Sequence, residues 1–302
     1  MTTNPGASLI QPQHEPDRKR PSRLAMALAL GMAMCVPLAG AQAATLADIK
    51  ERGQIRIAVA NEIPYGYVDL NGEAKGAGPD VARHIMKQLG IENIQWITTS
   101  FSSLIPGLRA DHFDMVAAEM AILPERCKQV LFSEPNTSYG EGLLVANGNP
   151  QDLHSYQDFA DSDHKVAIMA GADQLEMLQA LGVPSERMVT ISNNADAIST
   201  VSTGRAAAYA ATSLTVSELA RQSNRVEAAA NFTDPVIGGT PVRSWGGFTF
   251  SQNSEDLRGA VSNELAKFKQ TNEWKEILNT YGFSDTDATE STHRTTEQLC
   301  AG

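Results

Sequence analysis

Motifs for catalysis and metal binding are missing from this 302-residue sequence. It contains no H-E-x-x-H, no G-x-S-x-G, no C-x-x-C and no phosphate-binding loop, and Gly76-Ala77-Gly78 does not complete a dinucleotide fingerprint. The six histidines are scattered, and a solvated side chain is the simpler interpretation of His84 on a helix face. These absences favour binding over catalysis and predict no cofactor and no metal.

Positive charge is also scarce, with 24 basic against 35 acidic side chains and a net charge of −11. Without the first 43 residues the chain keeps 20 basic and 33 acidic side chains, which gives −13. Because phosphate binding needs positive charge, this balance excludes nucleic acid as a partner. Hydrophobic residues at 42% and charged residues at 20% are typical of a globular protein.

Only one long apolar run is present, and it has the features of an export signal. Basic residues at 18–23 precede an uncharged run over residues 24–44, which ends in the small-residue pattern Ala41-Gln42-Ala43. A retained membrane anchor is the alternative, but Pro37 and Gly40 interrupt the run. We therefore predict a signal peptide over residues 1–43, cleavage near Ala43 and a periplasmic protein, with Cys35 discarded in the signal.

Cysteine is rare, and the mature chain keeps only Cys127 and Cys300. An even number in an exported chain permits a disulfide. Two unrelated thiols are the alternative, and the residues alone leave both open.

Strand and helix patterns alternate along the mature chain. Alternating or β-branched runs predict strands at residues 54–60, 94–98, 113–118, 165–169, 189–191, 206–210 and 245–250. Helical spacing predicts helices that begin near Pro79, Ser102, Asp173, Asn194 and Leu257. This order predicts an α/β fold with two parallel sheets, hence two lobes, with an extended arm from Ser284.

The segment over residues 124–135, Pro-Glu-Arg-Cys-Lys-Gln-Val-Leu-Phe-Ser-Glu-Pro, follows a predicted strand directly. In open α/β sheets, ligands bind at the carboxyl ends of strands. Arg126 could make a bidentate contact to a carboxylate there, although a lone arginine is more often part of a surface salt bridge.

The string P-E-R-x-x-x-x-x-F-S-x-P resembles the signature of family 3 extracellular solute-binding proteins. Further similarity lies in I-P-Y-G-Y, in G-P-D-V-A-R-H-I-M-K-Q-L-G, in S-L-I-P-G-L-R-A-D-H-F-D-M-V and in N-E-W-K-E-I-L-N-T-Y-G-F. The resemblance covers nearly the whole mature chain. It implies a type II two-lobed fold with two doubly wound sheets, joined by crossing hinge segments near residues 143–147 and 243–247. Lobe 1 would hold residues 44–144 and 246–302, and lobe 2 residues 145–245.

The resemblance also implies the function of a non-enzymatic receptor. Such a protein binds a small solute in its cleft as a monomer and delivers it to the membrane permease subunits of an ABC importer. Within the family, the run G-E-G-L-L and the ending E-Q-L-C-A resemble receptors of ectoine and hydroxyectoine. We expect a disulfide between Cys127 and Cys300 that ties the C-terminal arm to lobe 1.

This resemblance assigns roles to several residues. Arg126 would hold the carboxylate of a small zwitterion, Tyr65 and Phe101 would present aromatic faces to its cation, and Glu62 would balance the charge. Further candidates follow in order of position. They are Glu119, where small residues are common; Asp173, for which helix capping is the simpler role; and Trp245, which is either a packed hinge residue or the aromatic that replaces Ala121.

One departure from the family pattern bears on the ligand. Amino-acid receptors of the family carry an aspartate that binds the α-ammonium group, and its expected position falls near Thr212. This departure favours a ring cation such as ectoine over an α-amino acid. A receptor for a polar amino acid, a dehydratase-like enzyme with Glu119 as its acid, and a sensor or structural module remain the alternatives.

Overall fold

The structure is a computed structural model that describes residues 44–301, so the predicted export signal and Cys35 lie outside the described residues. Within that range, no helix combines the length and the apolar character needed to cross a membrane.

The first sheet is built from parallel strands with an antiparallel return, in the order β4-β1-β5-β15-β6, and β7 also pairs with β15. Parallel pairing joins β1 to β4 and β5, whereas β15 runs antiparallel to β5. The strands are β1 Gln54–Val59, β4 Asn93–Thr98, β5 Met115–Ala121, β6 Leu131–Phe132, β7 Thr137–Tyr139 and β15 Ser244–Phe250. The small hairpin beside them consists of β2 Tyr67–Val68 and β3 Ala74–Lys75.

Helices with one apolar face cover this sheet, and we call sheet and helices together lobe 1. In α2 the buried positions Val81, Ile85 and Met86 have helical spacing, and the helix packs on β5 and α9. The helices are α1 Leu46–Arg52, α2 Ala77–Gln88, α3 Leu104–Arg109, α4 Pro124–Cys127, α9 Glu255–Phe268, α10 Asn272–Thr280, α11 Asp285–Glu290 and α12 Thr296–Ala301, with a short 3-10 turn η1 at Phe101–Ser103.

The prediction of an extended arm after Ser284 was wrong, because this segment forms α11 and α12. Ser284 and Asp287 make a capping box that satisfies the first backbone N–H groups of α11. Ala288 and Leu299 are buried, so each short helix has an apolar anchor. The capping box and the two buried side chains stabilise these short helices even though most residues of the segment are polar.

The second sheet has the order β10-β9-β11-β8-β12. Its strands β9, β10 and β11 are parallel, and β8 runs antiparallel to β11 and β12. The strands are β8 Glu141–Ala146, β9 Val166–Met169, β10 Met188–Ile191, β11 Ala208–Thr212 and β12 Val226–Ala228, and a separate hairpin holds β13 Val236–Ile237 and β14 Thr240–Pro241.

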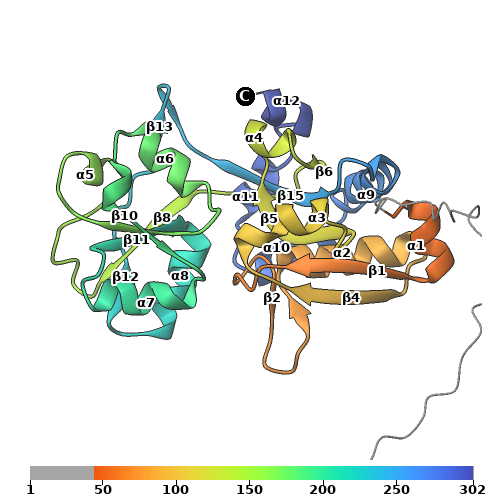
Figure 1. Cartoon of the computed structure of the whole chain (residues 1–302), viewed down its shortest axis with the longest axis horizontal. Helices are drawn as coiled ribbons and strands as arrows, with labels where there is room; N and C mark the ends of the chain where they lie inside the picture. Colours follow the sequence, from red (N-terminus) through yellow and green to blue (C-terminus); the bar gives the residue numbers. More distant parts are fainter. Residues whose placement is uncertain (1–43, 302) are drawn as a thin grey trace, which may run out of the picture. The chain divides into compact units, whose positions relative to one another are not determined.

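Four helices and a 3-10 turn accompany the second sheet, and together they form lobe 2. They are α5 Gln157–Ala160, α6 Gln174–Ala180, η2 Ser185–Arg187, α7 Ala195–Ser202 and α8 Ser213–Gln222. Thr212 caps α8, where its side chain accepts a hydrogen bond from the backbone N–H of Thr215 at 3.3 Å. The predicted α/β class with two sheets is confirmed (Figure 1).

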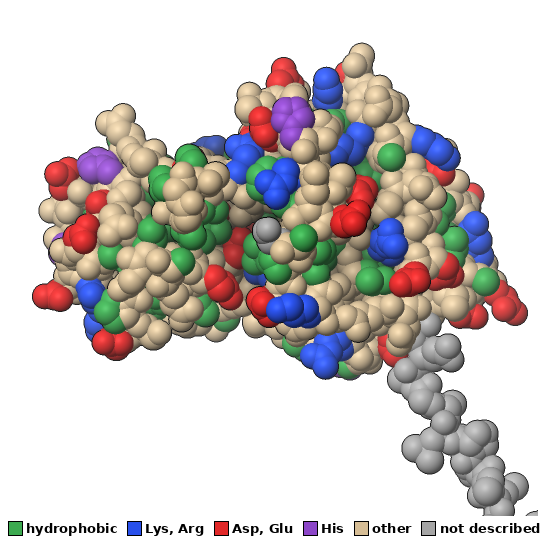
Figure 2. Space-filling view, turned by 90° about the horizontal axis from the view of Figure 1, so that it is seen from above, with side chains coloured by type: hydrophobic (Ala, Val, Ile, Leu, Met, Phe, Trp, Pro, Cys, Tyr) green, Lys and Arg blue, Asp and Glu red, His purple; other side chains and the backbone are tan. Residues whose placement is uncertain are grey.

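The chain passes between the sheets twice. It leaves lobe 1 after β7 and enters lobe 2 at Glu141, and it returns between β14 and β15. The first passage thus comes a few residues earlier than residues 143–147, because β8 begins directly after Gly140. The lobe limits at 144/145 and 245/246 remain a prediction. On the face drawn in Figure 2, Lys and Arg side chains lie among Asp and Glu rather than in one continuous patch.

The C-terminal helices brace lobe 1. Cys127 and Cys300 form a disulfide with a Cα–Cα distance of 5.7 Å, which ties α12 to α4. Asp287 of α11 pairs with Arg243, and its carbonyl accepts a hydrogen bond from Ser138 Oγ at 2.8 Å. Arg243 and Ser138 flank the two passages, so α11 holds both of them at their lobe 1 ends.

Candidate functional site

A small cavity lies between the two lobes. Its walls combine aromatic rings with carboxylates, at the carboxyl ends of β5, β9 and β11. The residues that line it are Glu62, Tyr65, Phe101, Ala118, Glu119, Ala121, Tyr139, Met169, Ala172, Asp173, Gln174, Tyr209, Ala211 and Thr212. Five of the predicted site residues, Glu62, Tyr65, Phe101, Glu119 and Asp173, are therefore brought together here.

A chain of hydrogen bonds links the lobes beside this cavity. The Tyr65 hydroxyl donates to Thr212 Oγ1 at 2.7 Å, Thr212 Oγ1 donates to Thr215 Oγ1 at 3.1 Å, and Thr215 Oγ1 donates to Glu62 Oε1 at 3.0 Å. Tyr65 and Glu62 belong to lobe 1, whereas both threonines belong to lobe 2. Thr212, at the position expected for aspartate, thus receives a tyrosine of the opposite lobe.

Glu62 and Tyr65 are both buried. Burial raises the pKa of the Glu62 carboxyl from 4.5 to about 7, against the hydrogen bond from Thr215, which lowers it. The Tyr65 ring packs edge-on against Tyr139 and Phe283, with centroid distances of 5.1 and 5.6 Å. Tyr65 is therefore both a core aromatic and a wall of the cavity.

Arg126 lies next to the cavity rather than among the residues that line it. Its Nη1 donates to the carbonyl of Ala121 and its Nη2 to the carbonyl of Gly171, each at 3.0 Å. Its Cζ lies 5.7 Å from the centroid of the Phe101 ring. Gly171 has φ +83°, and a Cβ there would come within 3.0 Å of Ser102 Cα, so glycine lets the lobe 2 backbone reach Arg126.

Glu119 is held entirely by lobe 1. Its Oε1 accepts a hydrogen bond from Asn136 Nδ2 at 2.8 Å and its Oε2 from Thr137 Oγ1 at 2.7 Å. Burial raises the pKa of this carboxyl to about 7, and the two hydrogen bonds oppose that shift. Its positive φ of 49° is unusual for a residue with a side chain.

Asp173 precedes α6 and points a carboxylate at the cavity. Its side chain makes no capping hydrogen bond to the helix, so the simpler role expected from the sequence is not used. Within residues 44–301, its Oδ2 accepts a single hydrogen bond, a long one of 3.3 Å from Ser244 Oγ. Among the described residues, no lysine, arginine or histidine forms an ion pair with it.

Trp245 lies away from the cavity. Its Nε1 donates to the carbonyl of Glu290 at 3.0 Å, and Arg294 lies over its ring at 5.4 Å. Both contacts come from the C-terminal segment. The geometry thus favours the packed hinge interpretation over a role in replacing Ala121.

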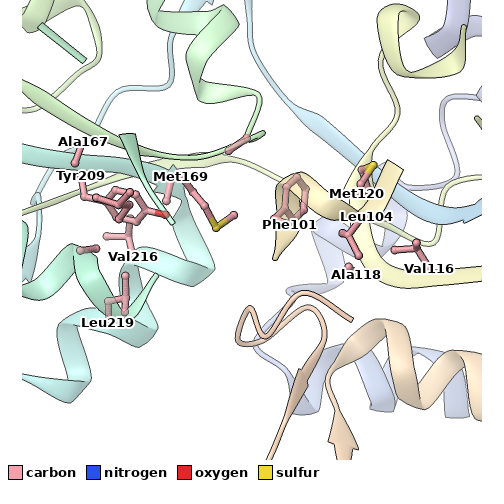
Figure 3. Packing of buried hydrophobic residues seen from close by; sticks show 14 of the residues in the cluster. Phe101, Leu104, Val116, Ala118, Met120, Ala167, Met169, Tyr209, Val216 and Leu219 are labelled. Carbon is pink, nitrogen blue, oxygen red and sulfur yellow. The ribbon is translucent and has the colours of Figure 1, made fainter. Parts of the chain in front are cut away.

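Several cavity residues were not predicted from the sequence. Tyr139, Met169, Gln174 and Tyr209 all line it. Figure 3 shows Met169 of lobe 2 and Phe101 of lobe 1 pointing towards each other. Tyr209 is the only aromatic residue in the alanine-rich run at residues 206–211, which was the available signal. Within residues 44–301, no group of three or more His, Cys, Asp or Glu side chains could hold a metal ion.

The sequence is similar to solute-binding proteins of ABC transporters. The family model of bacterial extracellular solute-binding proteins, family 3, matches residues 55–284. A probable amino-acid ABC transporter periplasmic-binding protein of Sinorhizobium fredii is 54% identical over 91% of this chain and 92% of its own length. The L-cystine-binding protein of Escherichia coli is 25% identical over 82% of this chain and 88% of its own length.

Solved structures agree in fold. The binding protein EhuB in complex with hydroxyectoine is 34% identical, with a TM-score of 0.77 over 85% of this chain and 98% of that one. An ancestral amino acid-binding protein, a precursor of cyclohexadienyl dehydratase, is 27% identical, with a TM-score of 0.68 over 79% of this chain and 99% of that one. The type II two-lobed fold and the family predicted from the motifs are both confirmed: the chain belongs to the family 3 bacterial extracellular solute-binding proteins.

Proposed function

We propose that this protein is the periplasmic receptor of an ABC importer. It captures a small zwitterion of the ectoine and hydroxyectoine type and presents it to the permease subunits. The observation that carries the proposal is the cavity itself, where aromatic faces and carboxylates of both lobes surround a space next to a buried guanidinium. The similarity to the hydroxyectoine complex supports the same ligand class.

The carboxylate of such a ligand needs a cation with N–H donors. Arg126 is 9% exposed, and its guanidinium lies over the ring of Phe101, which lines the cavity. Two of its N–H groups are bound to carbonyls, which fixes the plane of the guanidinium. A fixed, buried guanidinium with further N–H groups is suited to a carboxylate.

The cationic end of the ligand would meet the aromatic and acidic wall. Tyr65, Phe101, Tyr139 and Tyr209 line the cavity, and a delocalised cation over an aromatic face is stabilised by about 0.5–2 kcal/mol. Asp173 supplies a carboxylate without an ion-pair partner among the described residues. Glu62 acts mainly as a bond between the lobes, because Thr215 already binds it.

A polar amino acid is the second candidate ligand. The absence of an aspartate at Thr212 argued against an α-ammonium group, but Asp173 brings a carboxylate into the cavity from another element. The relative at 54% identity is described as a probable amino-acid transporter component. An α-ammonium group could bind Asp173 while Arg126 holds the α-carboxylate.

Thermal shift and calorimetry on the mature chain, unfolded and refolded to remove bound solute, test the proposal. The panel comprises ectoine, hydroxyectoine, glycine betaine, L-proline, L-arginine, L-glutamine and L-cystine. A ligand at 100 times its Kd stabilises the native state by about 2.7 kcal/mol and therefore raises the melting temperature. Because we expect the two ectoines to bind most tightly, we expect the largest shifts with them.

Three other outcomes would change the assignment. A larger shift with an amino acid would select the second candidate. Binding of neither class would contradict the proposed receptor function. Conversion of a bound cyclic carboxylic acid to a product would instead show an enzyme. The geometry disfavours that result, because both oxygens of Glu119 are held by Asn136 and Thr137.

A further inference from the structure

Glu141 lies one side chain behind the lobe 2 wall of the cavity. It is the first residue of β8, pairs in register with Thr212 of β11, and is 3% exposed. Its Oε2 accepts a hydrogen bond of 2.7 Å from Nε2 of Gln174, which lines the cavity. Among the described residues, its Oε1 has no hydrogen-bond partner.

The second donor near Glu141 is the Tyr156 hydroxyl, for which three acceptors compete. The Tyr156 hydroxyl has one hydrogen and three acceptors at 3.1 Å, namely Glu141 Oε2 and the carbonyls of Gly142 and Ala211. One hydrogen serves one acceptor at a time, so Glu141 has a single secure donor in the Gln174 amide. A buried carboxylate with one secure donor is costly, and the neutral acid costs much less.

The groups that face Glu141 add negative rather than positive charge. Asp173 precedes α6, and Asp234 precedes β13 and accepts a hydrogen bond from the Glu141 backbone N–H at 3.1 Å. Tyr156, Tyr209 and, from lobe 1, Tyr65 and Tyr139 complete the titratable neighbours. Burial raises the pKa of the Glu141 carboxyl well above 4.5, and the Asp173 charge raises it further.

Glu141 also orients Gln174. Since one N–H of Gln174 Nε2 is bound to Glu141, that nitrogen is held on the Glu141 side, and the amide oxygen Oε1 is the acceptor that remains on this side chain, beside the second N–H. The lobe 2 wall then offers hydrogen-bond acceptors to the ligand, with the Asp173 carboxylate beside the Gln174 oxygen. A group with N–H donors and a positive charge matches this wall, whereas a second carboxylate would be repelled.

We propose that Glu141 determines charge specificity from behind the wall: it holds Gln174 in the acceptor orientation, and it loses a proton when a cationic group binds beside Asp173. This inference rests on the proposed receptor function. On binding, the O–H bond of Glu141 breaks, its electron pair stays on the carboxylate, and the proton passes to the buffer. The positive charge of the ligand then compensates the new carboxylate.

Calorimetric titration in phosphate and in Tris at pH 7 measures this proton, because the two buffers differ in ionisation enthalpy. The probes are hydroxyectoine and L-arginine, and the variants are Glu141→Gln and, as a control, Asp163→Asn at an exposed lobe 2 position. For the wild type and Asp163→Asn, we expect heats that differ between the buffers and a Kd that falls from pH 6 to pH 8. For Glu141→Gln we expect a smaller difference in heat between the buffers, because the Glu62 and Glu119 carboxyls, each with a pKa of about 7, remain. We also expect a Kd about tenfold higher at pH 8, which corresponds to a pKa change of one unit.

The outcomes separate this inference from the proposed function. Binding by the wild type without buffer-dependent heat, or a Glu141→Gln variant that matches the wild type, overturns the role of Glu141 alone. Failure of both probes to bind the wild type overturns the proposed ligand class and this inference with it. If Glu141→Gln does not fold, buffer-dependent heat that persists in Glu62→Gln and in Glu119→Gln supports the role of Glu141, and its loss in either variant overturns that role.

Discussion

Lobe 1 holds the polar groups at its side of the cavity by hydrogen bonds, whereas the carboxylates at and behind the lobe 2 wall have few donors. In lobe 1, Glu119 is bound through both oxygens, and Arg126 donates to Ala121 of its own lobe and to Gly171 of lobe 2. In lobe 2, Asp173 has one long hydrogen bond, and Glu141 keeps an oxygen without a partner among the described residues. The Glu119 carboxylate is thus fixed within lobe 1, while the lobe 2 wall gains most from a positive charge.

The two lobes are also supported differently. The disulfide to α12 fixes α4, the helix that carries Arg126, and α11 holds the lobe 1 ends of both passages. Asp173 and Gln174 lie at the start of a seven-residue helix in lobe 2. We infer that lobe 1 orients the ligand and that lobe 2 selects its charge. Substitutions on the two sides should therefore have different consequences.

The largest effect is expected at Arg126. Replacement by alanine removes the cation from lobe 1 and strands the ligand carboxylate, so binding should weaken by about 2–5 kcal/mol. Calorimetry with the best ligand of the panel measures the loss. Arg221→Ala, at an exposed position in α8, is the matched control and should leave the Kd unchanged. Equal affinities for both variants would contradict the role of lobe 1 in orientation.

The next effect concerns stability: we expect the Glu119 carboxyl to make the free energy of unfolding depend on pH. Its pKa is about 7 in the folded protein, against the ordinary glutamate value of 4.5 in the unfolded chain, so the native state binds more protons between these values. This contribution to stability is complete below pH 4.5 and is lost as the pH rises towards 7, by about 3 kcal/mol. Denaturant unfolding at pH 5.5 and 7.5 should show a smaller difference for Glu119→Gln than for the wild type.

The exposed Glu125 provides the comparison for this titration. Glu125→Gln leaves the buried Glu119 carboxyl in place and should therefore keep the wild-type pH dependence. If Glu119→Gln keeps it as well, the Glu119 carboxyl is ionised throughout and its two hydrogen bonds outweigh its burial.

Trp245 gives a third test, because it contacts the C-terminal segment rather than the cavity. Trp245→Leu loses a hydrogen bond to Glu290 and the contact with Arg294, so stability should fall by roughly 1–3 kcal/mol. Ligand affinity should stay within about twofold of the wild type. Trp96→Leu, which loses a similar contact with Arg83, is the control. If Trp245→Leu lowers ligand affinity and Trp96→Leu does not, Trp245 contacts the ligand.

The sequence predicted the lobe 1 side of the site better than the lobe 2 side. Glu62, Tyr65 and Phe101 come shortly after predicted strands, lie in motifs of the family and line the cavity, whereas Arg126 lies next to it. Their roles in ligand binding remain a prediction. Whether Tyr209 and Gln174 face the cavity depends on how β11 and α6 lie against lobe 1. This tertiary arrangement leaves no local pattern in the sequence, so these two residues were not predicted. For Glu141, the sequence shows only one charged residue at the start of an apolar run.

The same reasoning explains where the fold prediction failed. Strands with alternating or β-branched residues, such as β1 and β4, were recognised from their own residues. The segment after Ser284 was mistaken for an extended arm, because helices of six residues have too few apolar positions to show a period. Trp245 was placed near the ligand from its hinge position alone, although its partners come from residues 290–294.

The smallest effect isolates the bond between the two lobes. Tyr65→Phe keeps the aromatic wall and removes only the hydroxyl that donates to Thr212. A typical hydrogen bond contributes about 0.5–1.5 kcal/mol, so the Kd should rise roughly threefold to tenfold. Tyr281→Phe, which removes a hydroxyl bonded to Asp80 within lobe 1, should leave the Kd unchanged. Combining Tyr65→Phe with Thr212→Val tests the pair directly: if the two losses add fully, the hydroxyls do not stabilise the closed lobes through each other. A combined loss close to either single loss would show that the lobe 1 wall and the charge-selective wall of lobe 2 are joined through this bond.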